Sequence, residues 1–387
     1  MKIAHVANTD YFCGFLLRDQ LRILRDAGHE VHAVSGPGPL LDGLRAEGIA
    51  VHTVANARRI DPGQDLRTLL AYIRLFRREE FDLVHTHNPK VNVLASIAAR
   101  AARVPRVVST LHGLYSHDGQ RAAVRKLWRG FESVGARCAD LVLCQSAEDV
   151  RTARWSRIVP DENLRRLGNG VDLARFDPRR FGREDRLALR RRFGIAENER
   201  VIGFVGRLVR EKGIEDLLEA ARELPRTRLL LVGPDERGAK ADGLDPTAFS
   251  AHASARWLGL RRDLPPIYAT FDTFVLPSHR EGFPRSLVES AAMGIPAVAT
   301  DIRGCREVIA PGETGCLVPP HSPTELMCAL RAMLRDPIRR ASWGRAARRR
   351  AEAHFDERAV FERVHRAYAE MPLPSAARRW SWAASSP

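Results

Sequence analysis

Short apolar segments alternate with amphipathic segments along the whole chain, in the order strand, loop, helix. The apolar run 2–7 predicts a buried strand, and residues 15–25 have apolar positions at helical spacing. Gly28 follows that helix in the position that favours a left-handed C-cap. Strands that alternate with helices predict a parallel sheet with helices on both faces. The other strands predicted in this half are 31–35, 82–85, 106–110 and 140–145.

A second series of the same kind begins at residue 201. Its predicted strands are 201–206, 228–233, 273–277, 297–300 and 315–318. We place the domain boundary between the two series, at residues 167–172, because the polar stretch 177–186 follows it. The pattern therefore predicts an α/β protein with two doubly wound, Rossmann-like domains facing a deep interdomain cleft. The expected parts are 1–172, 173–354, and a C-terminal helix and tail, 355–387, that returns to the N-terminal domain.

Composition agrees with two soluble domains. The chain has 387 residues, of which 44% are hydrophobic and 28% charged, so it can bury two cores and is not largely disordered. No apolar run reaches the roughly 18–20 residues that span a bilayer, since the best candidate, 91–99, contains Asn92 and ends at Arg100. The N-terminus is typical of a first strand rather than a signal peptide, and the six scattered Cys include no C-x-x-C. We therefore expect a reduced, cytoplasmic protein.

The net charge of +15 favours an acidic partner such as anionic lipid, a phosphorylated substrate or nucleic acid. The other interpretation is a compositional bias toward Arg, because only five of the 62 basic residues are Lys. Aromatic residues are sparse at 7%, and no nucleic-acid-binding motif is present. We expect no nucleic-acid partner.

Two carboxylates, Glu281 and Glu289, flank the start of a predicted helix at 286–293. Glu281 lies in the preceding loop, and Glu289 lies about one turn into the helix. Carboxylates accept hydrogen bonds from paired sugar hydroxyls, so the pair suits a hydroxyl-rich ligand. The alternative is a helix with a favourable acidic residue near its N-terminus. The spacing alone does not separate the two.

Two cations, Arg207 and Lys212, follow a predicted strand that ends at Gly206 and precede a helix that begins near Ile214. An Arg fork and a Lys point charge beside a helix N-terminus form a diphosphate clamp. The spacing of a Walker loop is absent. Taken alone, the two residues would more simply be solvated surface cations.

Histidines mark the ends of two strands in the first half. His85 and His87, followed by Lys90, are candidates for the acceptor side, although a strand-end pair satisfied by the backbone is an equally good interpretation. His112 is better placed for chemistry, because Gly113 follows it and permits close backbone approach.

The segment 121–131 has Val124, Leu127, Trp128 and Phe131 on one helical face. We interpret it as an amphipathic helix directed toward anionic lipid at the inner face of the cell membrane. The alternative is a core-facing stripe with a solvated basic rim. The residues of the proposed membrane interface are Arg121, Arg125, Lys126, Trp128 and Arg129.

The motifs occur together in an order that resembles the family 4 retaining glycosyltransferases of GT-B fold. The segments that carry the resemblance are 205–213, 277–289 and 294–300, supported by 110–113, 169–172 and 311–315. Segments 85–90 and 303–307 are most similar to those of enzymes that build bacterial surface polysaccharides. The likeness covers nearly the whole chain.

The resemblance implies a role for each donor-side residue. Arg207 and Lys212 would bind the diphosphate of a nucleotide-sugar, and Glu289 would hold the ribose hydroxyls. Glu281 would contact the transferred sugar. The backbone N–H groups of Gly282 and Phe283 would lie near that sugar, and the nucleobase would lie near Leu260 and Arg261.

The resemblance also implies that His112 sits at the reaction centre and that Gly14 lies close to the diphosphate. The family usually has a pair of glycines in this first loop, whereas here Cys13 precedes Gly14. A side chain at position 13 would narrow the loop.

The activity implied is transfer of a hexose or N-acetylhexosamine from a nucleotide-diphosphate sugar to a glycan acceptor that is lipid-linked, in cell-surface polysaccharide biosynthesis. The anomeric configuration would be retained, with the leaving phosphate oxygen accepting the acceptor's proton. We expect no cofactor and no metal, because the chain contains no D-x-D motif.

Three other functions stay open. The acceptor could be a soluble small molecule, in which case the helix at 121–131 would pack inward. The protein could be a nucleotide-sugar epimerase of similar fold, which the pair Glu281 and Glu289 disfavours. It could also be a non-catalytic protein that binds sugar-nucleotides or polyanions.

Overall fold

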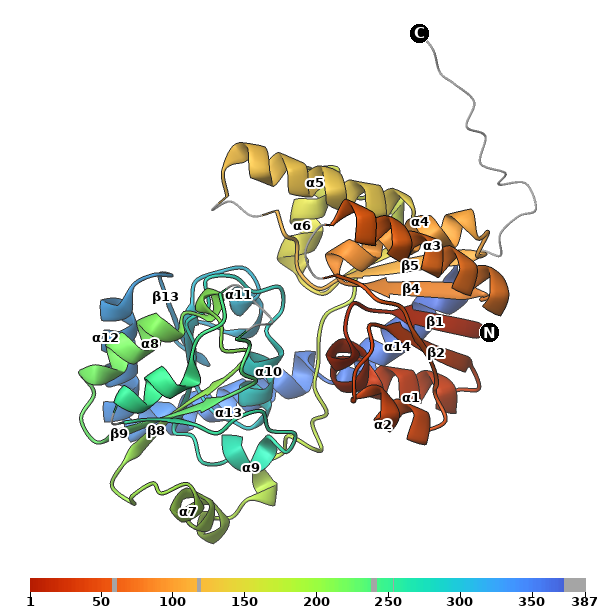
Figure 1. The fold of residues 1–387 in the computed structure, drawn as a ribbon. Coiled ribbons are helices and arrows are strands. Elements are labelled where there is room, and N and C mark those ends of the chain that lie inside the picture. Colours follow the sequence, from red (N-terminus) through yellow and green to blue (C-terminus); the bar gives the residue numbers. More distant parts are fainter. Residues whose placement is uncertain (58–60, 117–119, 238–241, 253, 372–387) are drawn as a thin grey trace. The chain divides into compact units, whose positions relative to one another are not determined.

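The chain forms two compact units, each built around its own parallel sheet (Figure 1). The computed structural model describes residues 1–57, 61–116, 120–237, 242–252 and 254–371. Unit 1 contains Met1–Leu167 together with the described residues from Phe361 onward, and unit 2 contains Gly168–Val360. The expected boundaries were 172 and 354, so both junctions lie a few residues from those positions.

Seven strands form the sheet of unit 1, in the order β3-β2-β1-β4-β5-β6-β7. Their bounds are β1 Lys2–Val6, β2 Glu30–Ser35, β3 Ala50–Thr53, β4 Leu83–His87, β5 Arg106–Leu111, β6 Leu141–Cys144 and β7 Leu164–Arg166. The strand order reverses between β1 and β4, which makes this pair the switch point of a doubly wound sheet. The register places His5 of β1 beside His85 of β4.

Helices cover both faces of this sheet. In one layer α3 (Pro62–Glu79), α4 (Pro89–Ala101) and α5 (Ala122–Arg137) lie side by side. In the other layer lie α1 (Arg18–Asp26), α2 (Leu41–Ala46) and the second half of α14 (Glu357–Glu370) (Figure 1). The remaining elements are the π-helical turn η1 (Phe12–Leu16), α6 (Ala147–Trp155) and the 3₁₀ turn η2 (Asp161–Asn163).

Unit 2 repeats the design with six strands in the order β10-β9-β8-β11-β12-β13. The strand bounds are β8 Arg200–Val205, β9 Thr227–Val232, β10 Ala255–Trp257, β11 Thr273–Leu276, β12 Ala297–Thr300 and β13 Gly315–Val318. The helices are α7 Arg183–Arg192, α8 Ile214–Arg222, α9 Pro265–Tyr268, α10 Arg285–Ala292, α11 Cys305–Val308, α12 Pro323–Arg335 and α13 Pro337–His354. Three short turns complete it: η3 Pro178–Arg180, η4 Arg210–Lys212 and η5 Pro246–Ala251. Its switch point lies between β8 and β11.

Every strand predicted from the sequence is present, with small shifts at its ends. Three strands were not predicted: β3, β7 and β10. All three are at the edge of a sheet, and they are only three or four residues long. Residues in β3 and β10 are mostly half-exposed or exposed, so these strands lack the continuous apolar run that marks a buried strand.

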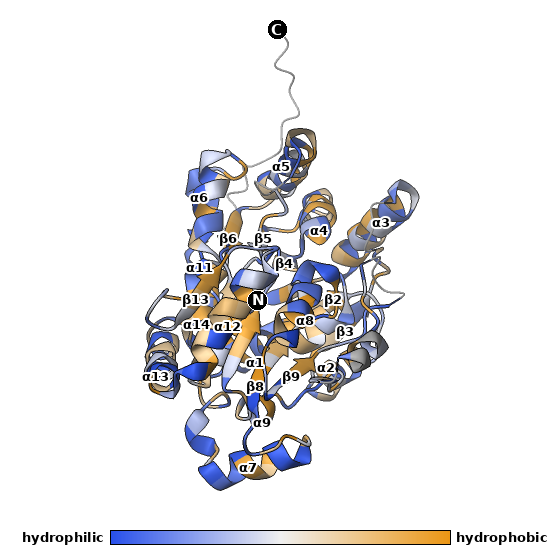
Figure 2. Cartoon of the chain, turned by 90° about the vertical axis from the view of Figure 1, so that its left-hand side faces the viewer, coloured by the Kyte–Doolittle hydropathy of each residue, from blue (hydrophilic) through white to orange (hydrophobic). Residues whose placement is uncertain are grey.

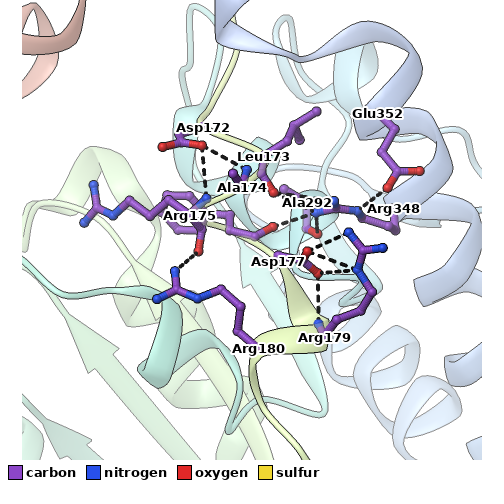
Figure 3. A network of polar contacts seen from close by, with 11 residues as sticks. Asp172, Leu173, Ala174, Arg175, Asp177, Arg179, Arg180, Ala292, Arg348 and Glu352 are labelled. Atoms are coloured by element: carbon purple, nitrogen blue, oxygen red, sulfur yellow. Dashed lines mark hydrogen bonds and ion pairs between the residues drawn. The ribbon is translucent and has the colours of Figure 1, made fainter.

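The polar stretch after the domain boundary is folded onto unit 2 instead of forming a loose linker (Figure 3). Asp172 Oδ1 accepts hydrogen bonds from the backbone N–H groups of Ala174 and Arg175. The Arg348 guanidinium of α13 donates to the carbonyl oxygens of Phe176 (2.6 Å) and Ala292 (2.7 Å). Arg348 thus joins the start of unit 2 to the end of α10 and the C-terminal helices.

Hydrophobic residues concentrate in the strands, while most helices carry both hydrophobic and hydrophilic residues (Figure 2). This is the distribution of sheets that are covered on both faces. Among the helices of the described residues, none is both long enough and apolar enough to cross a membrane.

Candidate functional site

The candidate donor residues of unit 2 follow the carboxyl ends of neighbouring strands. Arg207 comes directly after β8, and Glu281 follows β11. β8 and β11 pair at the switch point of this sheet. Because ligands of doubly wound sheets bind outside the carboxyl ends at the switch point, the fold itself brings these side chains to a binding position.

Lys212 and Glu281 form the centre of this group. Lys212 Nζ donates to Glu281 Oε1 at 2.5 Å, and Ser278 Oγ donates to the same oxygen at 2.7 Å. Both side chains of the ion pair are largely buried, with exposed fractions of 13% and 10%. Glu281 Oε2 has no hydrogen-bond partner among the described residues. The carboxylate is therefore held in place by one oxygen and can accept a ligand hydroxyl with the other.

Arg207 is half-buried, and no described residue accepts a hydrogen bond from its guanidinium or pairs with it. Arg210, a few residues on, is exposed and pairs with Glu215 at 3.2 Å. A guanidinium removed from part of its water favours an anionic partner. The Arg207 side chain is thus available for a ligand anion.

Two glycines permit the close packing that shapes this site. Gly213 is the N-cap of α8 with a φ of +64°, and a Cβ there would lie 2.0 Å from the carbonyl oxygen of Pro277. Gly304 has a φ of +83°, and a Cβ there would lie 2.4 Å from the carbonyl oxygen of Gly282. No described carbonyl accepts from the backbone N–H groups of Gly282 and Phe283, which precede α10. These groups remain available as donors to a ligand.

Glu289 lies inside α10 and is buried. Its Oε2 accepts from the Tyr268 hydroxyl at 2.9 Å, and its Oε1 lies 3.4 Å from Arg285 Nε. Burial raises the pKa of Glu289, although Arg285 and Tyr268 both oppose that shift. The long contact at Oε1 leaves that oxygen able to accept from ligand hydroxyls. Tyr268 and Arg285 were not predicted as site residues, since nothing in their spacing marks them.

Leu260 and Arg261 lie in the loop that follows β10. Both are exposed, and Arg261 Nε donates to the carbonyl oxygen of Leu258 at 2.8 Å. Gly259 accepts from the backbone N–H of Gly233, which follows the neighbouring strand β9. This loop therefore belongs to the same edge of the sheet as Arg207 and Glu281.

In unit 1, His112 follows β5 and is partly exposed. Its Nε2 lies 3.0 Å from His87 Nδ1, and the Phe12 ring packs edge-on against it with centroids 4.9 Å apart. Burial lowers the pKa of His112 to about 4, with a smaller opposing contribution from a hydrogen bond to Gln145. The ring is therefore neutral near pH 7.

The acceptor-side prediction for His85 and His87 is not supported by the structure. Both rings are buried, and both nitrogens of each are hydrogen-bonded within the protein. Lys90 pairs with Asp65, and its Nζ donates to the carbonyl oxygen of Ala57. The hydrogen bonds of these strand-end histidines are made within the protein, as the alternative interpretation expected. Their partners, however, are side chains and not the backbone.

Gly14 lies in the turn η1, where a Cβ would approach the carbonyl oxygen of Leu40 to 2.8 Å. The Cys13 side chain is buried and its Sγ lies 3.9 Å from the carbonyl oxygen of Val34. Burial raises the pKa of Cys13 to about 12. The Cys13 side chain therefore packs into the core. It does not narrow the first loop as we expected.

The helix α5 does not present its apolar stripe to the core. Val124 is 41% exposed and Leu127 is 70% exposed, while Trp128 is half-buried against the Tyr115 ring. The fully buried residues of α5 are Glu132, Gly135 and Ala136. The core-facing interpretation of segment 121–131 is therefore wrong for Val124 and Leu127, whereas Trp128 and Phe131 are half-buried.

An exposed tryptophan extends this surface. Trp155, the last residue of α6, is 80% exposed, and the Arg129 guanidinium lies 5.8 Å from its ring centroid. We call Val124, Leu127, Trp155 and the cations Arg121, Arg125, Lys126 and Arg129 the α5–α6 surface.

Three groups of described side chains have ligand atoms close enough together to hold a metal ion. They are His5, His85 and His87; His32, His52 and Glu79; and Asp216, His279 and His321. All three contain internal hydrogen bonds, such as His279 Nε2 to Asp216 at 2.9 Å. Side chains that already bond one another can pack without an ion, so none of these groups by itself indicates a metal.

Two family models match consecutive parts of the chain. Residues 16–175 match Glycosyltransferase Family 4, and residues 185–350 match Glycosyl transferases group 1. A relative from Escherichia coli, UDP-Gal:alpha-D-GlcNAc-diphosphoundecaprenol alpha-1,3-galactosyltransferase, is 29% identical over 79% of this chain and 80% of its own length.

A D-inositol 3-phosphate glycosyltransferase of Geodermatophilus obscurus is 31% identical over 76% of this chain and 69% of its own length. Among solved structures, Anabaena Alr3699/HepE in complex with UDP-glucose has a TM-score of 0.81 at 23% identity, covering 96% of this chain and all of the other. The fold is that of GT-B glycosyltransferases. Taken together with the residues of the two sheets, these matches show that the chain belongs to glycosyltransferase family 4.

Proposed function

We propose that the protein is a retaining, metal-independent glycosyltransferase that moves a hexose or N-acetylhexosamine from a nucleotide-diphosphate sugar to a lipid-linked glycan acceptor. Its product would enter cell-surface polysaccharide biosynthesis. The observation that carries the donor part is the half-buried Arg207 guanidinium without a described partner, in the same β8–α8 loop as Lys212, which pairs with Glu281. The Escherichia coli relative, which is named for a UDP-sugar donor and a diphosphoundecaprenol acceptor, supports the substrate classes.

In this proposal the two cations stabilise the charge that develops on the leaving diphosphate. Arg207 and Lys212 supply two positive charges, which lowers the need for a metal ion. Glu281 orients the transferred sugar through Oε2, and Glu289 accepts from the ribose hydroxyls through Oε1. His112 acts at the reacting sugar.

The leaving phosphate oxygen accepts the proton of the acceptor hydroxyl, on the face that the leaving group vacates. The new bond then forms with retained configuration, and no protein nucleophile is used. An NMR measurement of the anomeric configuration in donor and product tests this part directly. An inverted product would show that retention is wrong while leaving the donor site intact.

The donor site can be tested with one variant and a control from the same loop. Arg207→Ala should weaken binding of the nucleotide-sugar and slow transfer, because loss of one such contact costs roughly 2–4 kcal/mol, or about 30- to 1,000-fold. Arg210→Ala removes an exposed arginine that pairs with Glu215, and it should change neither by more than about threefold. Calorimetric titration with a panel of nucleotide-sugars measures both. Equal affinity in the wild-type protein and Arg207→Ala would show that Arg207 does not bind the donor.

The α5–α6 surface supports a lipid-linked acceptor at a membrane. If the acceptor were a soluble small molecule, we would expect this helix to pack inward. Instead, Val124 and Leu127 are exposed among cations. Exposed apolar residues surrounded by Lys and Arg are typical of a helix that lies on an anionic bilayer surface. Each cation near such a surface contributes about 1 kcal/mol.

Co-sedimentation with vesicles tests the membrane part. The protein should bind vesicles that contain anionic lipid, bind neutral vesicles weakly, and be released as salt rises. Replacing the four cations of the α5–α6 surface by Ser should abolish binding. The matched control replaces four exposed arginines of α7, namely Arg183, Arg186, Arg191 and Arg192, by Ser, which changes the net charge equally. If both quadruple variants lose binding alike, only net charge matters and the α5–α6 surface is not the membrane site.

A further inference from the structure

A chain of buried polar rings leads from the last described helix to His112. Tyr368 of α14 lies with its hydroxyl 3.4 Å from His5 Nε2, and His5 Nδ1 lies 3.1 Å from His87 Nε2. His87 Nδ1 lies 3.0 Å from His112 Nε2. A branch runs from the Tyr368 hydroxyl to His85 Nδ1 at 2.5 Å, and from His85 Nε2 to Thr110 Oγ1 at 2.7 Å. All of these side chains belong to unit 1.

These rings are cut off from water and uncharged. His5, His85, His87 and Tyr368 are each no more than 1% exposed. Burial lowers the pKa of His5 to about 3, lowers the pKa values of His85 and His87 well below the usual value, and raises that of Tyr368. A neutral imidazole has one N–H donor and one bare nitrogen acceptor. Each ring that donates to one neighbour must therefore accept from the other.

This rule leaves two arrangements of protons along the chain. In the first arrangement, the Tyr368 hydroxyl donates to His85 and accepts from His5 Nε2–H. His5 Nδ1 then accepts from His87 Nε2–H. His87 Nδ1 accepts from His112, which therefore carries its proton on Nε2. In the second arrangement, Tyr368 donates to His5, and donor and acceptor exchange roles in every bond of the chain. His112 then carries its proton on Nδ1. The tautomer of His112 therefore depends on the direction of the Tyr368 O–H bond.

The distances favour the first arrangement. Hydrogen bonds donated by O–H groups are typically 2.5–3.0 Å long, whereas those donated by N–H groups are about 2.7–3.2 Å long. The 2.5 Å contact to His85 therefore suits donation by the tyrosine hydroxyl. The 3.4 Å contact to His5 is longer than both ranges, so it is the weakest bond of the chain, and it lies nearer to the range of N–H donors than to that of O–H donors.

We propose that Tyr368, His5 and His87 form a relay that fixes His112 in the Nε2-protonated tautomer and leaves its Nδ1 bare. The bare nitrogen is an acceptor, for the Gln145 amide or for a sugar hydroxyl that takes its place. Tyr368 and the two buried histidines are positioning residues, because they act through His112 and do not touch substrate. The Gln145 amide, which can donate or accept, suits either tautomer.

The same three histidines, His5, His85 and His87, have the spacing of a metal site. In the relay, however, both nitrogens of each ring are already used in hydrogen bonds to neighbouring side chains. A metal ion would have to replace those bonds.

The tautomer can be read directly from nitrogen chemical shifts. In ¹⁵N-histidine-labelled protein without substrate, His112 should show a protonated Nε2 and a bare Nδ1. Tyr368→Phe removes the acceptor of the His5 N–H, so His112 should become a mixture of tautomers. Thr110→Val removes the acceptor of the His85 N–H, and because a buried donor is costlier to leave unpaired than an acceptor, the relay should reverse and protonate His112 on Nδ1.

The control is Tyr72→Phe, which removes another buried tyrosine hydroxyl of unit 1, 3.5 Å from Asn56 Nδ2 and outside the relay. It should leave the His112 tautomer unchanged. Three results would overturn the relay: a His112 protonated on Nδ1 in the wild-type protein, the wild-type tautomer retained in both Tyr368→Phe and Thr110→Val, or a stoichiometric metal ion on the three histidines in elemental analysis.

The kinetic consequence rests on the proposed function of His112. Tyr368→Phe should lower kcat on the order of tenfold to a hundredfold, as loss of a partner that orients a functional histidine does elsewhere. The donor dissociation constant should change much less than kcat, because Arg207, Lys212 and Glu289, which would bind the diphosphate and ribose, lie in unit 2. The two ideas fail separately. A changed tautomer in a protein without transferase activity refutes the function alone, whereas an active enzyme with an unchanged tautomer refutes the relay.

Discussion

Mild acid should destabilise unit 1 selectively, because that unit buries neutral histidines. His5, His85 and His87 have an ordinary pKa near 6.5 when the chain unfolds, and burial holds the native pKa far lower, to about 3 for His5. The unfolded state therefore binds more protons as the pH falls below 6.5. The stability that these rings provide is complete above that pH and is lost progressively toward their native pKa values.

The expected loss is large. Between pH 7 and pH 5, each ring that titrates only in the unfolded state removes about 2 kcal/mol of unfolding free energy. His5, with a native pKa of about 3, accounts for one such loss, and the lowered pKa values of His85 and His87 add to it, whereas a typical domain has about 5–15 kcal/mol in total. Glu47 and Glu79 have lowered pKa values, so their contribution is lost only below the ordinary carboxylate range, and a lower limit of pH 5 leaves them ionised.

Hydrogen exchange measured by mass spectrometry resolves the two units in one experiment. After correction for intrinsic exchange rates, peptides from β1 and β4 should lose several kcal/mol of opening free energy at pH 5. Peptides from β8 and β11 are the internal control. Burial raises the pKa values of Glu289 in unit 2 and of Glu132 in unit 1, so mild acid favours the native state of both carboxyls and only the histidines distinguish the units. Equal opening free energies for β1 and β4 at both pH values would refute the assignment of buried neutral rings.

Three further predictions concern unit 2. Glu281→Gln should chiefly lower kcat, whereas Glu289→Gln should chiefly raise the donor KM, because ribose contacts exist before and during reaction; equal kcat losses at unchanged KM would contradict this division. Transfer should survive exhaustive treatment with EDTA, and a full loss restored by Mg²⁺ or Mn²⁺ would refute metal independence. Gly213→Ala should lower the unfolding free energy by at least about 2 kcal/mol, because φ is positive there and the new Cβ would clash with Pro277. Gly312→Ala is the control, since Gly312 has a φ of +80° but open space around it, and it should cost only about 1–2 kcal/mol. A denaturant titration measures both.

Buried strands and the order of motifs could be predicted from the sequence, because a strand covered on both faces is mostly apolar. The edge strands β3, β7 and β10 could not, since they are short and mostly exposed. The donor-side residues follow predicted strands, so their common edge of the sheet was also predictable. Membership of glycosyltransferase family 4, inferred from the order of the motifs, is confirmed.

The histidine relay could be predicted only in part. His85 and His87 share one face of β4, since they are two residues apart, and His5 is a polar residue in an otherwise apolar strand. Their burial depends on α14, which comes from the far end of the chain. Tyr368 carries no local signal of its role, because the contact spans more than 280 positions along the chain. Patterns within a few neighbouring residues cannot predict a contact between residues so far apart along the chain.

The position of Tyr368 also has a consequence for synthesis of the protein. Unit 1 begins at the N-terminus, but its polar centre is closed by a residue that is translated about 200 positions after Leu167. While unit 2 leaves the ribosome, the first sheet lacks the hydroxyl that His85 and His5 contact. The nascent N-terminal unit should therefore stay an open, chaperone-accessible intermediate until α14 emerges. A stalled chain that ends near residue 355 should then be far more protease-sensitive in its first half than the released protein.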